Sequence, residues 1–327
     1  MEGLLMRRFF QKLLLTLIMV CLLTQSVSAA QLLIPVGQVI GVALEDQTVT
    51  VAAFDEDLGA AAKAAGLQVG DRIDEIDGMQ IRSVEDVHTA LTRSDGTVVL
   101  RIQRSGKQKQ LKLTPEITER GPKIGIYLRQ GITGIGTVTW YDPHTRKFGA
   151  LGHGVSTQDG ALVEATQGTA YRAAVTSVKK GQPGNPGQLI GTLESREPIG
   201  VLEKNTQQGI FGETETGWQG LCLPTARPEQ VRTGDATIRA TVQGRTVQEY
   251  SVEILKIYPT NRTNGRNMLL RITDPELLTI TGGIVQGMSG SPIIQDGKLV
   301  GAVTHVLVND PTTGYGIFIE NMLDAAA

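Results

Sequence analysis

The sequence predicts a mainly β protein in which a smaller α+β unit precedes a larger, all-β unit. The first observation is composition, because 39 glycines and only 4% aromatic residues among 327 indicate many tight turns. The second is spacing: short apolar or alternating runs recur from residue 124 onward, separated by glycine-rich or polar turns. Such runs are typical of a β-sandwich or barrel. The length is that of about two domains.

Composition also restricts the classes of function. The chain is 40% hydrophobic and 20% charged, which is ordinary for a globular protein with a sizeable core. Its net charge of −2 gives no electrostatic reason to expect a nucleic acid partner. The sequence has no His-Glu-x-x-His motif and no paired cysteines at metal-ligand spacing, so we expect no metal and no other cofactor.

Residues 1–29 are predicted to be an export segment. Arg7, Arg8 and Lys12 supply positive charge, and an almost wholly apolar run follows at residues 13–23. Small residues at its end resemble a cleavage site, and the run is short for a permanent anchor. We therefore expect a cleaved signal peptide, with a retained N-terminal membrane segment as the alternative. Only one of the two cysteines would then remain, so a disulfide within one molecule is excluded.

The first globular unit is predicted over residues 34–116. Short strands come first, followed by a small helical patch at residues 60–65 and a second helix from Ser83 to about Thr92. Ser83 is the expected N-cap of the second helix, and Asp86 occupies the capping-box position. The apolar stripe of this helix consists of Val84, Val87, Ala90 and Leu91. Two further strands complete the unit.

Residues 65–78 carry the order Ala-Gly-Leu-x-x-Gly-Asp-x-Ile-x-x-Ile-Asp-Gly directly before that helix. This order resembles a bacterial PDZ domain. The resemblance implies that an extended peptide, either a partner's C-terminus or a segment of this chain, adds beside the strand at residues 40–44. The expected groove residues are Ile40, Gly41 and Val42 on the strand and Val84, Val87 and Leu91 on the helix. The alternative is that the three helix residues belong only to the core.

Residues 117–123 are expected to link this unit to a second one at 124–327. The stretch from Pro115 to Pro122 is polar and bracketed by prolines, as a connector is. Near the C-terminus, Asp296 and Gly297 separate two apolar runs and predict a two-residue hairpin turn.

The turn at residues 287–292, Gly-Met-Ser-Gly-Ser-Pro, is the strongest candidate for a catalytic nucleophile. Glycine at 287 and at 290 permits a sharp backbone bend and close approach of a substrate. A nucleophilic serine needs such a bend, with backbone N–H groups close enough to hold a developing oxyanion. Taken alone, the motif also fits an ordinary β-turn.

A serine hydroxyl needs a base to take its proton, and histidine is the usual one. In the second unit, His144 lies in a polar turn and His305 follows a hairpin strand. His153 instead lies between two glycines, with apolar residues beyond them. A tight, uncrowded bend suits a catalytic base, so His153 is the preferred partner of Ser289.

The acidic residue that would orient His153 is less well defined. Asp274 ends a predicted strand and precedes Ser289 by fifteen residues. Asp159 and Glu164 lie closer to the histidine in the sequence. Spacing alone does not choose among these three.

Three segments together resemble the SpoIVB peptidase family of endospore-forming bacteria: the Leu-Gly-His-Gly turn, the Thr-Asp-Pro segment, and residues 281–297 with the Gly-Ala-Val-Thr-His-Val that follows. The similarity extends from the export segment to the C-terminus. It implies a PDZ domain followed by a trypsin-like double β-barrel serine peptidase. By the same resemblance, His153 is the general base, Ser289 the nucleophile and Asp274 the acid. The N–H groups of Gly287 and Ser289 form the oxyanion hole, Thr304 supports the site from an adjoining strand, and Ser291 is only a turn residue.

The resemblance also implies a role in spore formation. The enzyme would be exported from the forespore into the space between its two membranes. There it would cleave itself and a membrane-bound inhibitor of an intramembrane protease, which leads to sigma-factor activation.

Two other functions fit parts of the same sequence. The first is a PDZ-linked quality-control protease, although such chains usually carry the PDZ domain after the catalytic domain. The second is a catalytically silent PDZ scaffold, against which the intact turns around His153 and Ser289 count.

Overall fold

The computed structural model describes residues 30–119, 121–156, 162–163, 167–260 and 265–327. The predicted export segment at 1–29 lies outside the described residues. In the part of the chain that is described, no helix is long and apolar enough to cross a membrane. The described chain is dominated by strands, which confirms the predicted mainly β class.

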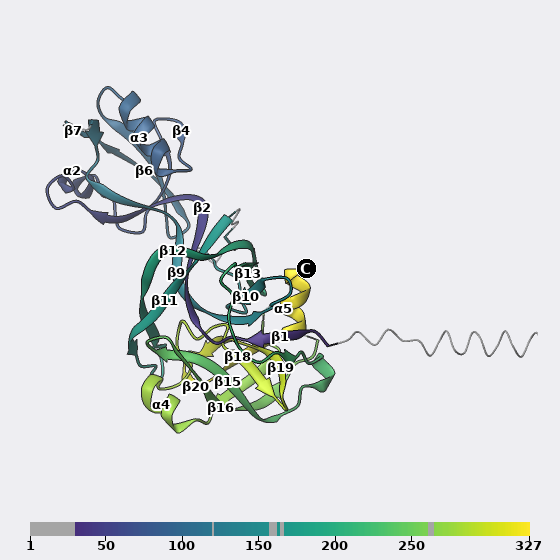
Figure 1. Cartoon of the computed structure of the whole chain (residues 1–327). Helices are drawn as coiled ribbons and strands as arrows, with labels where there is room; N and C mark the ends of the chain where they lie inside the picture. Colours follow the sequence, from purple (N-terminus) through teal and green to yellow (C-terminus); the bar gives the residue numbers. More distant parts are fainter. Residues whose placement is uncertain (1–29, 120, 157–161, 164–166, 261–264) are drawn as a thin grey trace, which may run out of the picture. The chain divides into compact units, whose positions relative to one another are not determined.

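Six strands close into a ring that forms the first barrel (Figure 1). They are β2 (Val39–Phe54), β9 (Ile126–Tyr141), β10 (Lys147–Ala150), β11 (Gln167–Lys179), β12 (Gln188–Thr206) and β13 (Gly209–Glu213). Their order is β9-β10-β13-β12-β11-β2, and pairing of β2 with β9 completes the ring. Two short strands, β1 (Leu32–Pro35) and β14 (Leu223–Pro224), extend the sheet from β9.

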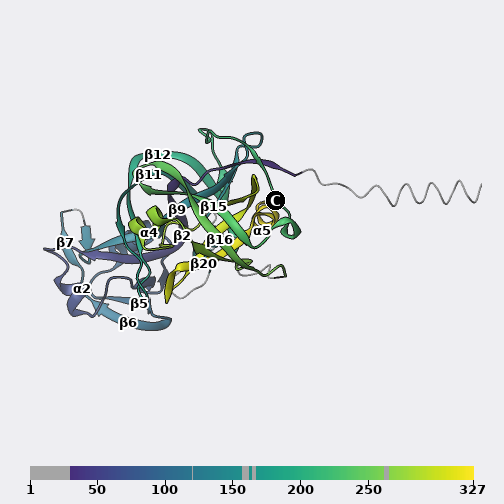
Figure 2. The same cartoon turned by 90° about the horizontal axis from the view of Figure 1, so that it is seen from below.

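A second closed barrel has the order β15-β16-β17-β20-β19-β18. Its strands are β15 (Gly234–Gln243), β16 (Thr246–Ile257), β17 (Met268–Ile272), β18 (Pro292–Gln295), β19 (Lys298–Leu307) and β20 (Asp310–Phe318). The 3-10 helix η1 (Pro228–Gln230) precedes β15, α4 (Pro275–Thr281) follows β17, and α5 (Ile319–Ala326) follows β20. The paired strands β15 and β16 lie side by side in both views (Figure 2). The predicted double barrel is confirmed.

The hairpin predicted at Asp296 and Gly297 joins β18 to β19. Gln295 pairs with Lys298 across it. Asp296 and Gly297 both have a positive φ, at 49° and 71°. Positive φ at both central residues matches the right-handed twist of the strands, so this turn sets the register of the hairpin.

The α+β unit lies in sequence between the two long strands β2 and β9. It contains β3 (Arg72–Ile76), β4 (Met79–Gln80), β5 (Val98–Arg104), β6 (Lys107–Leu113), β7 (Glu116–Thr118), β8 (Gly121–Lys123) and the helices α2 (Ala60–Ala64) and α3 (Val84–Arg93). Ser83 and Asp86 form the predicted capping box at the start of α3. The unit has its own buried cluster, which includes Ile73, Leu100 and Ile102.

Strand pairing corrects the predicted start of this unit at residue 34. Residues 40–44 pair on one side with β9 and on the other with β11, so they form a strand of the first barrel. Farther along β2, residues 49–50 pair with β3, and residues 49–54 pair with the start of β9. The unit is therefore an insertion between two barrel strands. The prediction of two consecutive units, the first ending before the barrels begin, is therefore wrong.

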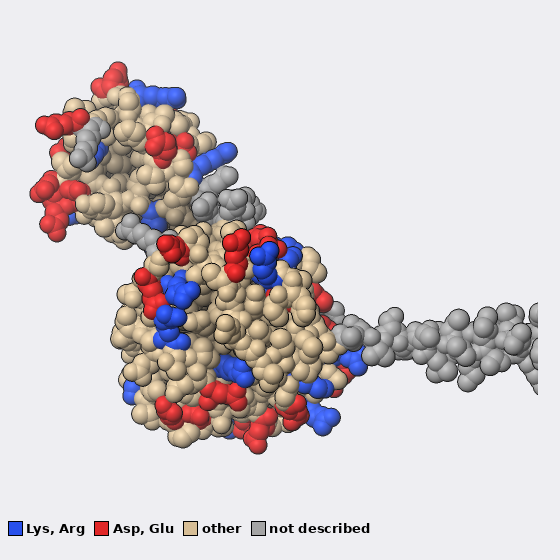
Figure 3. Space-filling model, in the orientation of Figure 1, with Lys and Arg blue, Asp and Glu red and all other residues tan. Residues whose placement is uncertain are grey.

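Charged side chains of both signs are interspersed on the face shown in Figure 3. This distribution accords with the net charge of −2.

Candidate active site

The Ser289 turn has a backbone that only glycine can adopt at two places. Gly287 and Gly290 have φ values of 98° and 97°, in the region that side chains resist. A Cβ atom on residue 290 would lie 2.0 Å from the carbonyl oxygen of Thr137. The backbone of β9 therefore passes too close to this turn for any residue other than glycine.

Hydrogen bonds to both barrels hold the turn in place. From β9, the Thr137 hydroxyl donates to the Gly287 carbonyl at 2.7 Å, and the Thr137 N–H donates to the Ser289 carbonyl at 3.1 Å. The Gly290 N–H donates to the Val303 carbonyl on β19 at 2.8 Å. The N–H groups of Gly287 and Ser289, in contrast, donate to no acceptor among the described residues. Two free N–H groups beside a serine are the donors that an oxyanion hole requires.

The Ser289 hydroxyl donates a hydrogen bond to the Thr304 carbonyl at 2.7 Å. Thr304 is buried, and its own hydroxyl donates to the Gly265 carbonyl at 2.8 Å. Thr304, which is on β19, thus lies beside Ser289, as the sequence predicted. Ser291 is fully buried, which leaves Ser289 as the serine of this turn that a substrate can reach.

His153 lies on a strained turn directly after β10. Leu151 and Gly152 both have a positive φ, at 68° and 67°, and Leu151 is one of few non-glycine residues with this geometry. A Cβ atom on Gly152 would lie 2.9 Å from the Thr304 methyl group. The histidine turn of the first barrel therefore packs directly on the strand that accepts the Ser289 hydrogen bond.

The imidazole of His153 is oriented by a backbone carbonyl. Its Nδ1 lies 2.9 Å from the carbonyl oxygen of Gly154. Because a carbonyl can only accept, Nδ1 carries the proton in this contact, and Nε2 is left free to accept one. That tautomer is the one a general base for a serine needs.

Asn205, on β12, is hydrogen-bonded to the segment that follows His153. Its side-chain oxygen accepts from the Val155 N–H at 2.9 Å, and its amide group donates to the carbonyls of Val155 and Val163 at 2.8 and 2.9 Å. Sequence reasoning missed this residue. Its partners lie 42 and 50 positions away, so no local motif marks it.

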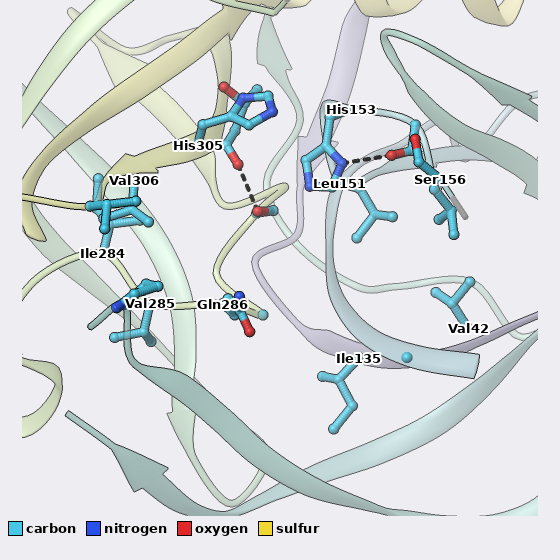
Figure 4. A pocket seen from close by; sticks show the side chains of 18 residues that line it. Val42, Ile135, Leu151, His153, Ser156, Ile284, Val285, Gln286, His305 and Val306 are labelled. Carbon is cyan, nitrogen blue, oxygen red and sulfur yellow. Dashed lines mark hydrogen bonds between the residues drawn. The ribbon is translucent and has the colours of Figure 1, made fainter. Parts of the chain in front are cut away.

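A cavity of about 600 Å³ brings the site together. Ser289, Gly287, His153 and Thr304 all contribute to its lining. His153 and His305 lie next to each other in Figure 4, with the apolar side chains Ile284, Val285 and Val306 on one side and Ile135 and Val42 on the other. The structure therefore places four of the five predicted active-site residues around one cavity.

His305, which the sequence did not favour as the base, is part of this site. Its ring centre lies 5.2 Å from that of His153, and its Nδ1 is buried without a hydrogen-bond partner among the described residues. Burial, then the nearby charges of His153 and Arg266, lower the pKa of His305 to about 4. Burial also lowers the pKa of His153 below 6.5, against the opposing effect of the Gly154 carbonyl. Both rings are consequently neutral at neutral pH.

Asp274 does not reach His153. One of its carboxylate oxygens accepts from the Leu277 N–H at 2.9 Å and caps α4, and the other accepts from the Ser251 N–H at 3.3 Å. Asp274 is not among the residues that line the cavity. The expectation that it orients the imidazole is thus corrected: in this structure it is a helix cap. The other two candidates, Asp159 and Glu164, lie outside the described residues.

Family comparisons agree with this geometry. A model of the SpoIVB peptidase S55 family matches residues 120–323, and a PDZ domain model matches residues 56–104. The first match covers more than half of the chain. The chain belongs to the SpoIVB peptidase S55 family. It carries a PDZ domain, as the sequence predicted.

Curated relatives match only parts of this peptidase. A putative zinc metalloprotease of Bartonella henselae is 38% identical over 76 residues, which cover 23% of this chain and 21% of that protein. Another putative zinc metalloprotease, of Rhizobium meliloti, is 28% identical over 172 residues, which cover 50% of this chain and 44% of that protein. The chain thus spans less than half the length of these relatives. Among its described residues, no group of three or more His, Cys, Asp or Glu could hold a metal ion.

Solved structures with some similarity include two of the Rv3671c protease. Its inactive form has a TM-score of 0.36 at 13% identity, covering 59% of this chain and 82% of that chain. The active form, from M. tuberculosis, has a TM-score of 0.33 at 17% identity, covering 61% of this chain and 75% of that chain.

The predicted peptide-binding strand of the PDZ domain is not available to a peptide. Ile40, Gly41 and Val42 pair with β11 on one side and β9 on the other, so no edge is left for an added strand. On α3, Val87 and Leu91 are only 3% and 4% exposed, so they belong to the core, which was the alternative for the helix residues. Val84 is 42% exposed. The predicted groove is therefore wrong on its strand side.

An open strand edge lies instead at the start of β9. Residues 126–130 pair on one side with β2, and no described strand pairs with their other side. Helix α3 packs against β9, and the Val84 N–H donates to the Gln130 side chain at 3.3 Å. The sequence shows an apolar run that begins at residue 124, but the position of residues 126–130 beside α3 depends on pairing with residues more than 70 positions away.

Proposed function

We propose that this peptidase is an exported serine endopeptidase whose nucleophile is Ser289 and whose general base is His153. The observation that carries the proposal is the shared cavity, in which Ser289, His153 and two free N–H groups meet. Serine supplies the attacking oxygen, histidine moves the proton, and the N–H groups stabilise the negative charge of the transition state.

The reaction begins from the arrangement in which the Ser289 hydroxyl donates to Thr304. Rotation about the Cα–Cβ bond redirects that hydroxyl toward Nε2 of His153. As Oγ attacks the substrate carbonyl carbon, the proton passes to Nε2, and the oxyanion accepts from the N–H groups of Gly287 and Ser289. Nε2 then protonates the leaving amine as the C–N bond breaks. Water, deprotonated by the same histidine, then attacks the acyl carbon, and the histidine returns the proton to Ser289 Oγ as the C–Oγ bond breaks.

Mutation of the two catalytic residues tests this chemistry. Residues 30–327 of the wild type, Ser289→Ala and His153→Ala are compared for self-cleavage and for hydrolysis of a denatured protein. Each variant should lose activity by roughly 10⁴-fold or more. Ser177→Ala, at an exposed position on β11, is the matched control and should retain full activity. Equal fragmentation of all four proteins would rule out the serine mechanism.

The biological proposal follows from the family and from the predicted export segment at residues 1–29. The enzyme is made in the forespore and acts between its two membranes. It cuts itself and a membrane-bound inhibitor of an intramembrane protease, and this cut leads to sigma-factor activation. Complementation in the source organism tests this role. A strain without the wild-type gene should fail to form spores when it carries Ser289→Ala and form them when it carries Ser177→Ala. Normal sporulation with Ser289→Ala would refute the role and leave the chemistry standing.

The proposed docking edge for the protein substrate is residues 126–130 of β9, beside α3. An extended segment added there would gain main-chain hydrogen bonds from the strand. Deletion of residues 34–116 cannot test docking, because it would remove barrel residues 40–44. Since Leu44 pairs with Ile132, residues 46–130 can instead be replaced by an Asn-Gly turn. This variant should lose cleavage of the partner and keep hydrolysis of a short peptide. Equal loss of both would argue against docking.

A further inference from the structure

The cavity around Ser289 is lined by uncharged groups. Among the described residues that line it, none is Asp, Glu, Lys or Arg, and both histidines are held neutral by burial at neutral pH. The apolar members include Ile135, Leu151, Ile284, Val285 and Val306. A volume of about 600 Å³ lies within the usual range of ligand-binding cavities.

The reaction fixes which part of the substrate meets this wall. Attack by Ser289, with the oxyanion at the N–H groups of Gly287 and Ser289, places the substrate carbonyl carbon at the turn. The side chain of the residue that owns this carbonyl branches one bond away, so it must enter the adjoining space. That space is bounded by residues 284–287, which lead into the turn, and by Thr304 to Val306 on β19.

We propose that this peptidase cleaves on the carboxyl side of uncharged aliphatic residues, whose side chains occupy the apolar cavity beside Ser289. The inference rests on the serine peptidase chemistry proposed above. An aliphatic side chain gains from leaving water for the surfaces of Ile284, Val285 and Val306. A Lys, Arg, Asp or Glu side chain would lose its hydration with no opposite charge on the described wall to replace it.

Among the described residues, Arg266 is the one Arg or Lys side chain whose charge contributes to the lowered pKa of His305. It does not line the cavity, and its guanidinium lies over the ring of Tyr315 at 5.2 Å. If Arg266 selected the substrate, acidic residues would be preferred at the cleaved position. The specificity measurement therefore distinguishes the two outcomes.

The test is a peptide library derived from a whole proteome, incubated with residues 30–327 and analysed by mass spectrometry. Cleavage after Val, Leu, Ile and Ala should exceed cleavage after charged residues by roughly 100-fold. Ser289-dependent cleavage that prefers Lys, Arg, Asp or Glu would overturn this inference alone. Cleavage that is the same with Ser289→Ala would overturn the proposed chemistry, and the inference with it.

A designed variant sharpens the test. Val306 is half-buried, so it can be changed with less risk to folding than Ile284 or Val285, which are 2% and 1% exposed. Val306→Asp should raise cleavage after Lys and Arg relative to Val by at least about tenfold. Val201→Asp, on β12 outside the cavity and 53% exposed, should leave the preference unchanged.

A second substitution keeps the inference testable if Val306→Asp does not fold. Val306→Ala enlarges the cavity and should shift the preference from Val and Ala toward Leu and Phe. An unchanged preference in a folded Val306→Ala protein would show that the cavity does not receive this side chain.

Discussion

The Ser289 turn and the His153 turn form one site, but they are held in different ways. The Ser289 turn is fixed by backbone bonds to β9 of the first barrel and β19 of the second, and by the hydroxyl groups of Thr137 and Thr139. The His153 turn is fixed by backbone bonds from Leu151 to Thr137 and from Gly152 to Ala150, and by the side chain of Asn205. The Ser289 turn is thus bonded to both barrels, whereas these bonds of the His153 turn all lie within the first barrel.

This difference indicates which half of the site is adjustable. In the structure the Ser289 hydroxyl donates to Thr304 and the His153 Nδ1 bonds to Gly154, so the two catalytic side chains are not hydrogen-bonded to each other. Catalytic hydrogen bonds are often loose or absent without substrate. Bringing them together requires rotation of side chains and no change in the Ser289 backbone. We therefore expect changes in the Ser289 turn to be the more damaging.

The largest effect is expected from Gly290→Ala. The added Cβ would meet the Thr137 carbonyl at 2.0 Å and force the turn away from β9, which would displace the oxyanion donors. Loss of such donors costs roughly 10²- to 10³-fold in kcat. Gly297→Ala is the control, because it also has a positive φ but its Cβ would meet nothing within 4 Å. Peptide hydrolysis and Tm are measured for both. Activity of Gly290→Ala within tenfold of the wild type would contradict a main-chain constraint.

A smaller effect is expected from Asn205→Ala, which removes three hydrogen bonds to the His153 turn. Misplacement of a catalytic group by about 1 Å costs on the order of 10²-fold, so we expect kcat to fall by about 10- to 100-fold. Asn185→Ala, at an exposed site, is the matched control. Because the Ser289 turn should remain intact, the crystal structure of Asn205→Ala should show Thr137 still bonded to Gly287 and Ser289. A rate equal to that of the control would mean that the His153 turn is held by other contacts.

A third effect concerns pH. His153 must be neutral to accept the Ser289 proton, and burial lowers its pKa below 6.5. A lowered pKa keeps the base neutral in more acidic solution, so the acid limb of kcat/KM should have its midpoint below pH 6.5. The measurement is peptide hydrolysis from pH 4 to 9, with circular dichroism to confirm that the protein stays folded. A midpoint well above 6.5 would indicate an acidic partner that stabilises the imidazolium, which the described residues do not supply.

The sequence was sufficient for the features that are encoded locally. Ser289, Gly287 and His153 were predicted because sharp turns and the residues that tolerate them are adjacent in the chain. The hairpin at Asp296 and Gly297 was predicted for the same reason.

Features created by distant pairing could not be predicted in this way. Residues 40–44 are apolar and strand-like in either a PDZ domain or a barrel, and only their pairing with β9 and β11 distinguishes the two. His305 enters the site because β19 carries it next to His153 from the other barrel. Asn205 likewise acts on residues that are far away in the sequence. In each case the residue type is uninformative, and the neighbours decide the role.

The smallest effect is expected at Asp274, where two substitutions separate a helix cap from a catalytic acid. Asn caps a helix about as well as Asp, so Asp274→Asn should preserve the bond to Leu277 and leave kcat within about twofold. Asp274→Ala should lose the cap and about 1 kcal/mol of the free energy of unfolding, measured by urea denaturation. An acid that orients the imidazole behaves differently, since its change to Asn lowers kcat by about 10⁴-fold. A loss of that size in a stable Asp274→Asn protein would show that Asp274 leaves the start of α4 and moves to His153 when substrate binds.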